Sequence, residues 1–476
     1  MPTVGAATLP SVRNSLLFLA AVVLGQWLLL ANPGYFSHDE LAWGTRATAG
    51  ALASLPWQSW LDIGTFQYRP LTFNLWLLIA HWLHDWPHLF HGLWVGFGSA
   101  LAWLLRSVLR RCGLTDALAT TAALVFLLNP YAVYVHGWVA TLADLIWVGC
   151  GLGLAWWLLV RYPLAGVTAR ATGNEAKATA PATGRSGLVE LAVGALAMVL
   201  ALSAKEAGLA LAPLAWLGWL LLGRPAPWLR IAIGLSLPAL AYLALRLGVI
   251  LYLPRPDEAY AWSLAAVAGN IVSYPLFVLI PTAPEVGSTL LASPLRLALA
   301  GLFWLALLAG LLRAGWRLAV AFVLGIGLAL GPVLILDGPA NQYAYGASLL
   351  AVALVALAWP RLPAWARLVV VTMALVSVWH GINVQRFIHR AGQVQTVFSP
   401  ALAAAVAAHG DQTVTIALDH EPERWLYQRL SYDPIAYGRR RPSVQIVTPG
   451  SEAMYRAAYN GQLIRVTGPG SGPVPH

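Results

Sequence analysis

The sequence predicts an all-α polytopic membrane protein of about eleven transmembrane helices, with a small extracytoplasmic α/β appendage at the C-terminal end. Of its 476 residues 59% are hydrophobic and only 10% are charged, and the mean hydropathy is +0.68. Soluble proteins carry about 25% charged residues, so this composition excludes a soluble globular chain. Runs such as residues 14–31 and 368–379 contain no ionised side chain, and a bilayer-spanning helix needs about 20 apolar residues.

Turn residues and charges divide the apolar sequence into candidate spans. The first run is as long as a full span and ends at Asn32-Pro33-Gly34, which does not resemble the small-residue cleavage site of a signal peptide. We therefore expect it to remain as the first helix. The expected spans are residues 14–32, 88–108, 115–134, 138–160, 188–203, 207–223, 230–252, 295–312, 318–336, 346–359 and 367–382.

The distribution of charge predicts the orientation in the membrane. With the N-terminus in the cytoplasm, fourteen of the twenty Lys and Arg residues before position 386 fall on the inside, and ten of the thirteen Asp and Glu residues fall at or beyond the outer edge. This is the positive-inside pattern of membrane proteins. The net charge of +10 is thus explained by topology, and we expect no nucleic-acid partner.

Four regions are expected to depart from simple spans within a membrane domain of residues 1–385 and a C-terminal region of residues 386–476. Residues 33–87 form a first outer loop with an interfacial helix at Leu71–Leu83, and residues 163–187 form a flexible linker. Residues 253–294 hold a re-entrant or interfacial segment that breaks near Tyr274-Pro275, because a further crossing there would invert every later loop. In the C-terminal region we expect a helix at 400–408, strands at 413–418, 443–447 and 463–466, and a disordered end.

Ionisable groups near membrane depth are costly and mark candidate functional sites. The first cluster is His38-Asp39-Glu40, just beyond the first helix. Of two adjacent carboxylates, one can act as a general base while the charge of the other shifts its pKa. The alternative is a solvated loop or the cap of the following helix. Arg69 lies between Tyr68 and Pro70, and its guanidinium can bind a phosphate or carboxylate through two N–H groups at once. The alternative is that Arg69 anchors the loop at the membrane interface.

Three further groups lie along the later spans. Asp144 lies about one turn into the fourth helix, where an unpaired charge is costly. Lys205-Glu206 interrupts a hydrophobic hairpin at its outer turn. The two residues either form a simple turn or pair with each other at a site for a lipid phosphate. Arg246, in the outer half of the seventh helix, requires either an anionic partner or a route to the interface.

A metal site has weak support. His84, His88 and His91 share one helical face, but no carboxylate lies at ligand spacing within that run, although Asp85 is adjacent. We therefore assign no metal ligands. Cys112 and Cys150 are not expected to form a disulfide, because Cys112 falls in a cytoplasmic loop.

Several short motifs, among them Asp39-Glu40, Tyr68-Arg69-Pro70-Leu71-Thr72 and Lys205-Glu206, resemble in their order the GT-C superfamily of polyprenyl-phosphate-sugar-dependent glycosyltransferases. The resemblance is closest to the membrane part of the TMTC-type O-mannosyltransferases and more distant to the dolichyl-phosphate mannosyltransferases and the aminoarabinose transferases. The resemblance covers roughly residues 14–385. Leu142 and Gln342 stand where the family has Arg, and the tetratricopeptide array of the family is absent. The matching elements are Asp39-Glu40, Tyr68-Arg69-Pro70-Leu71-Thr72 with Phe90-His91, Asn129-Pro130-Tyr131 through Ala143-Asp144-Leu145, Ser203-Ala204-Lys205-Glu206-Ala207-Gly208, Arg246, and Asn341-Gln342-Tyr343-Ala344-Tyr345.

This resemblance implies an inverting transfer of a sugar from a polyprenyl-phosphate donor lipid to a saccharide, lipid or protein acceptor outside the membrane, in a bacterial inner membrane. It implies Asp39 as the base with Glu40 assisting, and Arg69, Lys205 and Arg246 as ligands of the donor phosphate. Supporting positions are His38, Tyr68, Asp144, Glu206 and Tyr345. No cofactor is assigned, and a divalent cation is left open. The alternatives are a transporter or flippase, which should show internal repeats, and a non-catalytic envelope-assembly protein.

Overall fold

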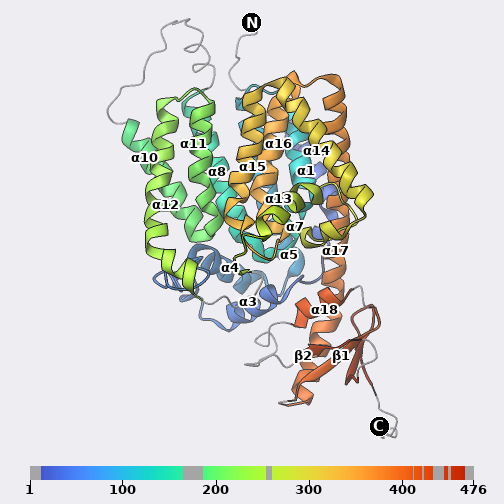
Figure 1. Ribbon diagram of the computed structural model, residues 1–476. Coiled ribbons are helices and arrows are strands. Elements are labelled where there is room, and N and C mark those ends of the chain that lie inside the picture. The colour runs from blue at the N-terminus through green and yellow to red at the C-terminus, as the bar shows by residue number, and fades with distance from the viewer. Residues whose placement is uncertain are drawn as a thin grey trace, which may run out of the picture.

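The fold is a bundle of long helices with a small mixed sheet at one end (Figure 1). The computed structural model describes residues 12–163, 186–253, 260–410, 412–420, 423–431, 444–448 and 452–466. The linker expected at 163–187 and the expected disordered end lie almost wholly outside these residues.

Eight of the described helices are long and apolar enough to cross a membrane. They indicate an integral membrane protein, as the composition predicted. Each coincides with an expected span, but the expected count of eleven is not confirmed. The eight are α5 (Pro87–Arg111), α8 (Leu142–Arg161), α10 (Ser186–Ala204), α12 (Ala226–Tyr252), α14 (Pro294–Ala314), α15 (Trp316–Leu334), α16 (Tyr345–Ala358) with its flanking 3-10 turns η6 (Asn341–Ala344) and η7 (Trp359–Arg361), and α17 (Ala364–Ala408).

The other three expected spans are interrupted. The first consists of α1 (Val12–Gly25) and α2 (Trp27–Leu30), and the sixth consists of η3 (Glu206–Ala210) and α11 (Leu211–Leu221). The third divides into α6 (Asp116–Leu128) and α7 (Pro130–Gly137), which are bent by 60° and together would make a ninth span.

The bend between α6 and α7 has a local cause. Pro130 has no N–H to continue α6, and the Asn129 side chain accepts hydrogen bonds from the N–H groups of Tyr131 and Ala132, which starts α7 in a new direction. Helix α17 packs against this bend at Gly381, where a Cβ atom would lie 1.9 Å from the Leu128 carbonyl oxygen. Only glycine allows this approach.

Short helices cover the end of the bundle nearer the sheet. They are α3 (His38–Ala49), η1 (Leu55–Trp57), α4 (Pro70–Leu83), η2 (Val139–Thr141), α13 (Ala266–Phe277) and η5 (Val286–Leu291). Helix α4 confirms the short helix expected at 71–83. At about 18 Å, α13 is shorter than the roughly 30 Å hydrocarbon core, so it does not span by itself. It continues through Pro275 to Phe277, so the break expected at Tyr274-Pro275 is absent.

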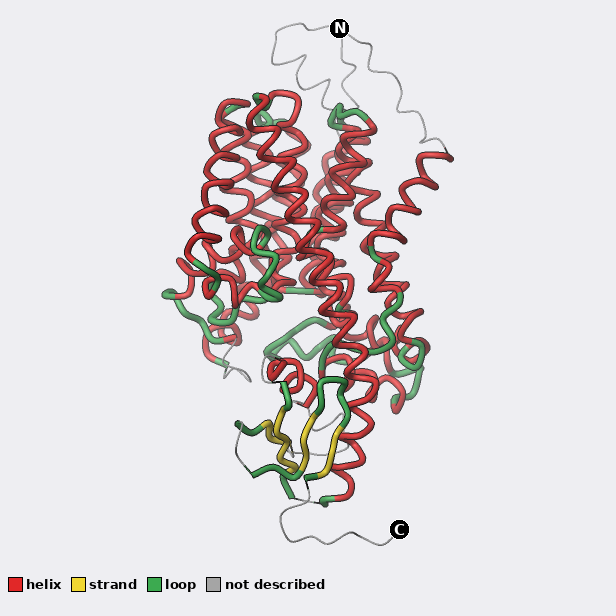
Figure 2. The backbone as a smooth tube through the Cα atoms, turned by 90° about the vertical axis from the view of Figure 1, so that its right-hand side faces the viewer, coloured by secondary structure: helices red, strands yellow, loops and turns green. Residues whose placement is uncertain are grey.

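Helix α17 has 45 residues and is about 68 Å long, more than twice the hydrocarbon thickness. It therefore leaves the bundle and runs beside the sheet (Figure 2). The separate helix expected at 400–408 is the end of α17, and the expected boundary at 385/386 lies inside this helix. Beyond residue 385 the helix accommodates two residues that weaken helices, Gly392 and Pro400.

The sheet has the order β2-β1-β3-β4, with β1 parallel to β2 and β3, and β4 antiparallel to β3. Strands β1 (Val414–Leu418), β2 (Val444–Ile446) and β4 (Leu463–Arg465) confirm three expectations. Strand β3 (Tyr455–Ala457) and helix α18 (Arg424–Ser431) were not expected. We call α18 and these four strands the appendage.

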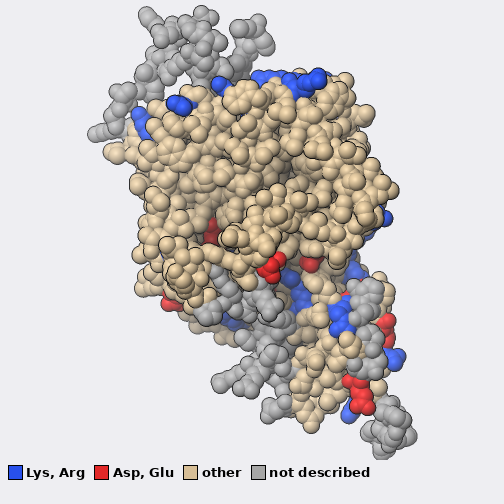
Figure 3. Space-filling model, in the orientation of Figure 1, with Lys and Arg blue, Asp and Glu red and all other residues tan. Residues whose placement is uncertain are grey.

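The two ends of the bundle differ in charge. The connections after α5, α11, α14 and α16 lie at the end away from the appendage, where Lys and Arg side chains gather on the surface (Figure 3). We call this the basic end and the other the appendage end. The arginines in these connections and in the helix ends beside them are Arg110, Arg111, Arg224, Arg313, Arg317 and Arg361.

Candidate functional site

A cavity of about 290 Å³ at the appendage end holds three of the predicted site residues. Asp39 of α3 lies in its wall, together with Tyr68 and Arg69 at the start of α4. Helix α4 begins at Pro70, whose fixed backbone angle suits the first helical position. The cavity thus brings an acid and a cation that are 30 residues apart in the first outer loop onto one surface.

Asp39 is the accessible carboxylate of the acidic pair. Its side chain is 31% exposed, and one oxygen lies 3.3 Å from Nε2 of His38. The Nδ1 atom of His38 lies 3.2 Å from the backbone carbonyl oxygen of Arg429 in α18. His38 therefore connects the carboxylate to the appendage, and Asp39 is left facing the cavity.

Glu40 has a different position. It is fully buried, and its carboxylate accepts hydrogen bonds from the N–H groups of Phe36, Ser37 and Val139 at 2.6, 2.9 and 2.8 Å. With Ser37 it forms a capping box at the start of α3. Burial raises the pKa of Glu40 to about 8, although the three N–H donors oppose this shift. Glu40 thus fixes α3 against η2, and its carboxylate is not in the cavity wall.

The residues Lys205 and Glu206 do not pair with each other, contrary to the self-paired site considered from the sequence. The ammonium of Lys205 donates to both oxygens of Asp144 at 2.7 Å, and both side chains are at most 5% exposed. Nε of Arg69 donates to Glu206 at 2.9 Å. Because this bond uses Nε alone, both terminal amino groups of Arg69 remain outside the pair.

These two ion pairs are adjacent. Lys205 and Glu206 are consecutive, and Thr72 of α4 donates to the carbonyl of Ala204 at 2.9 Å. The ring of Tyr343 lies 5.0 Å from the Lys205 ammonium. The pairs therefore form one polar cluster that connects α4, α8 and η3 and begins at the cavity wall with Arg69.

Arg246 lies beneath the first outer loop. It is 1% exposed, and its terminal amino groups donate to the carbonyl oxygens of Ile63, Thr65 and Phe66. Its guanidinium stacks over Tyr68 at 5.3 Å. These contacts explain why the charge is tolerated and make Arg246 an anchor of the loop; it is not among the residues that line the cavity.

Tyr345 is also buried in the bundle. Its hydroxyl lies 3.1 Å from Nε2 of His136, whose Nδ1 lies 2.9 Å from the amide nitrogen of Gln26. It joins α7 and α16 inside the core and does not line the cavity.

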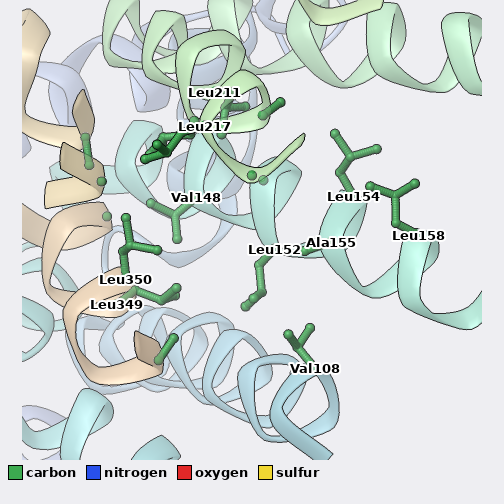
Figure 4. A pocket seen from close by; sticks show the side chains of 18 of the residues that line it. Val108, Val148, Leu152, Leu154, Ala155, Leu158, Leu211, Leu217, Leu349 and Leu350 are labelled. Atoms are coloured by element: carbon green, nitrogen blue, oxygen red, sulfur yellow. The ribbon is translucent and has the colours of Figure 1, made fainter. Parts of the chain in front are cut away.

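An apolar pocket of about 310 Å³ lies between helices of the bundle, and Figure 4 shows side chains that line it. Its walls come from α5, α8, α11, α12, α15 and α16 and include Trp147, Val148, Leu211 and Leu350. Trp147 donates its indole N–H to Asp144 at 3.2 Å. A single side chain therefore borders the apolar pocket and contacts the ion pair of the polar cluster.

Sequence reasoning missed two arginines near Asp39, one in α3 and one in α18. Arg46, one α3 turn after Trp43, lines the cavity. The guanidinium of Arg429 stacks over Trp138 and Phe36 at 4.5 and 5.0 Å and acts electrostatically on Asp39, Glu40 and Glu285. The helical spacing of Leu426, Tyr427 and Leu430, all buried, was a signal for α18, but its partner surface was not predictable.

Among the residues that the structure describes, no three His, Cys, Asp or Glu side chains are grouped to hold a metal ion. Asp39 is the one carboxylate among the residues that line the cavity.

Comparison with protein-family models finds no match, and comparison with curated proteins finds no significant one.

Proposed function

We propose that the protein is a membrane glycosyltransferase that moves a sugar from a polyprenyl-phosphate carrier to an acceptor at the extracytoplasmic face, with inversion. The observation that supports this most is that the Asp39 carboxylate and the Arg69 guanidinium belong to residues of one cavity wall, as a base and a phosphate-binding cation would need to. The appendage end would then be extracytoplasmic and the basic end cytoplasmic, in a bacterial inner membrane.

The donor needs an apolar route for its isoprenoid chain and cations for its phosphate. The apolar pocket bordered by Trp147 adjoins the polar cluster, and the cluster ends at Arg69 on the cavity. Arg69 is the donor-phosphate ligand in this proposal, because its terminal amino groups lie outside the pair with Glu206. Lys205 and Asp144 hold the wall behind it.

The reaction has one proton transfer and one displacement. Asp39 accepts the proton of an acceptor hydroxyl, and that oxygen bonds to the anomeric carbon from the face opposite the phosphate. The bond between the anomeric carbon and the phosphate oxygen breaks, and its electron pair leaves with the polyprenyl phosphate. Arg69 stabilises the charge that develops on this leaving group.

The remaining predicted residues position these two. Glu40 sets the start of α3 and thereby the direction of Asp39, and His38 fixes the Asp39 carboxylate and contacts the appendage. Arg246 holds residues 63–66 close to Tyr68, and Glu206 holds Arg69. In this proposal Glu40 and Arg246 therefore act through other groups and do not touch the substrates.

The test uses purified full-length protein with labelled polyprenyl-phosphate hexoses and pentoses and a panel of saccharide, lipid and peptide acceptors. We expect acceptor-dependent release of free polyprenyl phosphate, and loss of that release in Asp39→Asn. In vesicles, a flippase would instead move the donor across the bilayer without cleaving it. Donor that stays intact with every acceptor, or release that is equal in Asp39→Asn, would contradict the proposal.

A further inference from the structure

A second and larger apolar cleft, of about 520 Å³, lies between α6, α14, α15, α16 and α17. It is separate from the pocket bordered by Trp147, with which it shares no lining residue. Its wall runs along α6 from Thr115 to Asn129, a length of about 21 Å at 1.5 Å per residue. Because one leaflet contributes only about half of a 30 Å hydrocarbon core, the cleft is long enough for a whole acyl chain.

The wall of the cleft is mostly apolar, with Thr115, Thr121 and Ser377 among its few polar residues. Leu118, Ala122 and Val125 line one side, and Ala351, Val352 and Val355 line another. The polar residues at its deep end are satisfied by their own backbone. Ser348 donates to the Tyr345 carbonyl at 2.8 Å, and Asn129 bonds to Phe126, Tyr131 and Ala132. The cleft therefore offers mainly apolar contacts, which suit a hydrocarbon chain.

The mouth of the cleft lies at the basic end. Thr115 and Trp359 line it there, and the exposed Arg361 is two residues beyond Trp359. Arg367 donates from Nε and Nη2 to the carbonyls of Trp359 and Pro360, which keeps its guanidinium at the same place. On the other side, Arg110 lies 3.4 Å from Asp116, the residue after Thr115.

The charge at this mouth is positive. The carboxylate there, Asp116, is already paired with Arg106 and Arg110. Arg361 and Arg367 form no ion pair among the described residues. Arginines that flank an apolar crevice at the cytoplasmic side of a membrane protein suit an anionic lipid headgroup.

We propose that this cleft binds one acyl chain of an anionic phospholipid whose phosphate lies at Arg361 and Arg367. The acyl chain fills the space between α6, α16 and α17 and contacts all three helices. The site is independent of the proposed sugar transfer, whose donor phosphate would lie at the opposite end of the bundle.

The experiment compares phosphatidylglycerol with phosphatidylcholine of identical acyl chains. Full-length protein is stripped of lipid in mild detergent, each lipid is titrated, and bound lipid is counted by native mass spectrometry while Tm is recorded. We expect one tightly held phosphatidylglycerol and a larger rise in Tm than phosphatidylcholine gives. Arg361→Gln should weaken phosphatidylglycerol binding about fivefold and leave phosphatidylcholine binding unchanged.

Two further variants keep the test specific. Ala351→Phe fills the cleft and should abolish the tight site, and Arg224→Gln removes an exposed arginine of the basic end away from the cleft and should change nothing. Equal binding of both lipids, an unchanged site in Ala351→Phe, or displacement of phosphatidylglycerol by polyprenyl phosphate would each overturn the proposal. If Ala351→Phe fails to fold, the comparison of Arg361→Gln with Arg224→Gln still decides.

Discussion

Charged side chains at the two ends of the bundle are held in different ways. At the basic end the cations of the pairs Arg161–Glu190 and Arg230–Glu190 are 44% and 36% exposed, and the atoms lie 3.8 and 3.4 Å apart. At the appendage end Lys205 and Asp144 are 5% and 3% exposed and 2.7 Å apart. The first arrangement keeps its cations in water, whereas the second removes both charges from it.

The comparison separates charges that hold helices together from charges that set the orientation of the protein in the membrane. A solvated arginine gains little from its partner, but its exclusion from the membrane fixes the topology. A buried pair contributes little net stability as a pair, yet each member becomes indispensable once the other is present. The candidate site adjoins the Lys205–Asp144 pair, in which both charges are buried.

The largest effect should come from Asp39→Asn, which tests whether the appendage end is catalytic. Loss of a general base lowers the rate of transfer by about 10²–10⁴-fold, while the half-exposed position leaves folding intact. The measurement is acceptor-dependent release of polyprenyl phosphate. Asp62→Asn, an exposed acid in the same outer loop, serves as the control and should retain the wild-type rate.

The next effect tests burial directly. Lys205→Ala leaves the Asp144 carboxylate unpaired inside the protein and should lower the free energy of unfolding by about 3–5 kcal/mol. Arg161→Ala at the basic end should cost about 0–1 kcal/mol, because its guanidinium is partly solvated and Arg230 still pairs with Glu190. Denaturant unfolding in mixed micelles measures both. Equal losses would remove the distinction between the two ends.

The combined variant Asp144→Leu with Lys205→Met sharpens this test. It removes both charges and preserves the apolar volume, so it should be more stable than Lys205→Ala. A loss as large as that of Lys205→Ala would show that contacts other than the ion pair hold these residues.

A smaller effect is expected for binding of the donor headgroup. Arg69→Ala should weaken binding of polyprenyl phosphate about 10–100-fold, the loss of a charged hydrogen bond of about 1.5–3 kcal/mol. Arg46→Ala lies on the same cavity wall but is exposed, so its effect should be several times smaller. Equilibrium binding without acceptor is the measurement, and a stronger effect of Arg46→Ala would move the phosphate site to α3.

The last prediction concerns the pH dependence of stability that Glu40 causes, which is small for each pH unit. Burial raises its pKa to about 8, so between pH 4.5 and 8 the unfolded chain releases a proton that the folded protein keeps. Stability should therefore fall as pH rises through this window, by at most about 1.4 kcal/mol per unit. Glu40→Gln should lose this dependence. A Tm that rises with pH in the wild type only would show that the N–H donors keep Glu40 ionised.

Much of the fold was predictable because the hydropathy of each segment determines whether it lies in the bilayer or in water. Eight long apolar helices coincide with expected spans, and three of the four strands follow from alternation and turn residues. The α6–α7 bend was not anticipated, although Asn129-Pro130 is its signal. The continuity of α17 was also missed, because the fall in hydropathy after residue 385 suggested an end that the backbone does not make.

For the candidate site, the sequence predicted which residues take part but not which contacts they make. The pattern identified Asp39, Arg69, Asp144, Lys205 and Arg246 as costly charges. It did not reveal that Arg246 holds loop carbonyls, nor that both Glu40 oxygens are occupied by N–H groups. Those contacts depend on segments that only folding brings together.

The sequence by itself determined that this chain belongs in a bilayer, which end is basic, and which side chains would need partners there. The tertiary structure alone decided the pairing. Lys205 bonds to Asp144, 61 residues away, and Arg69 bonds to Glu206, 137 residues away, while the neighbours Lys205 and Glu206 do not pair. The physical reason is that hydropathy acts on each segment separately, whereas the partner of a buried charge is set by how the helices pack.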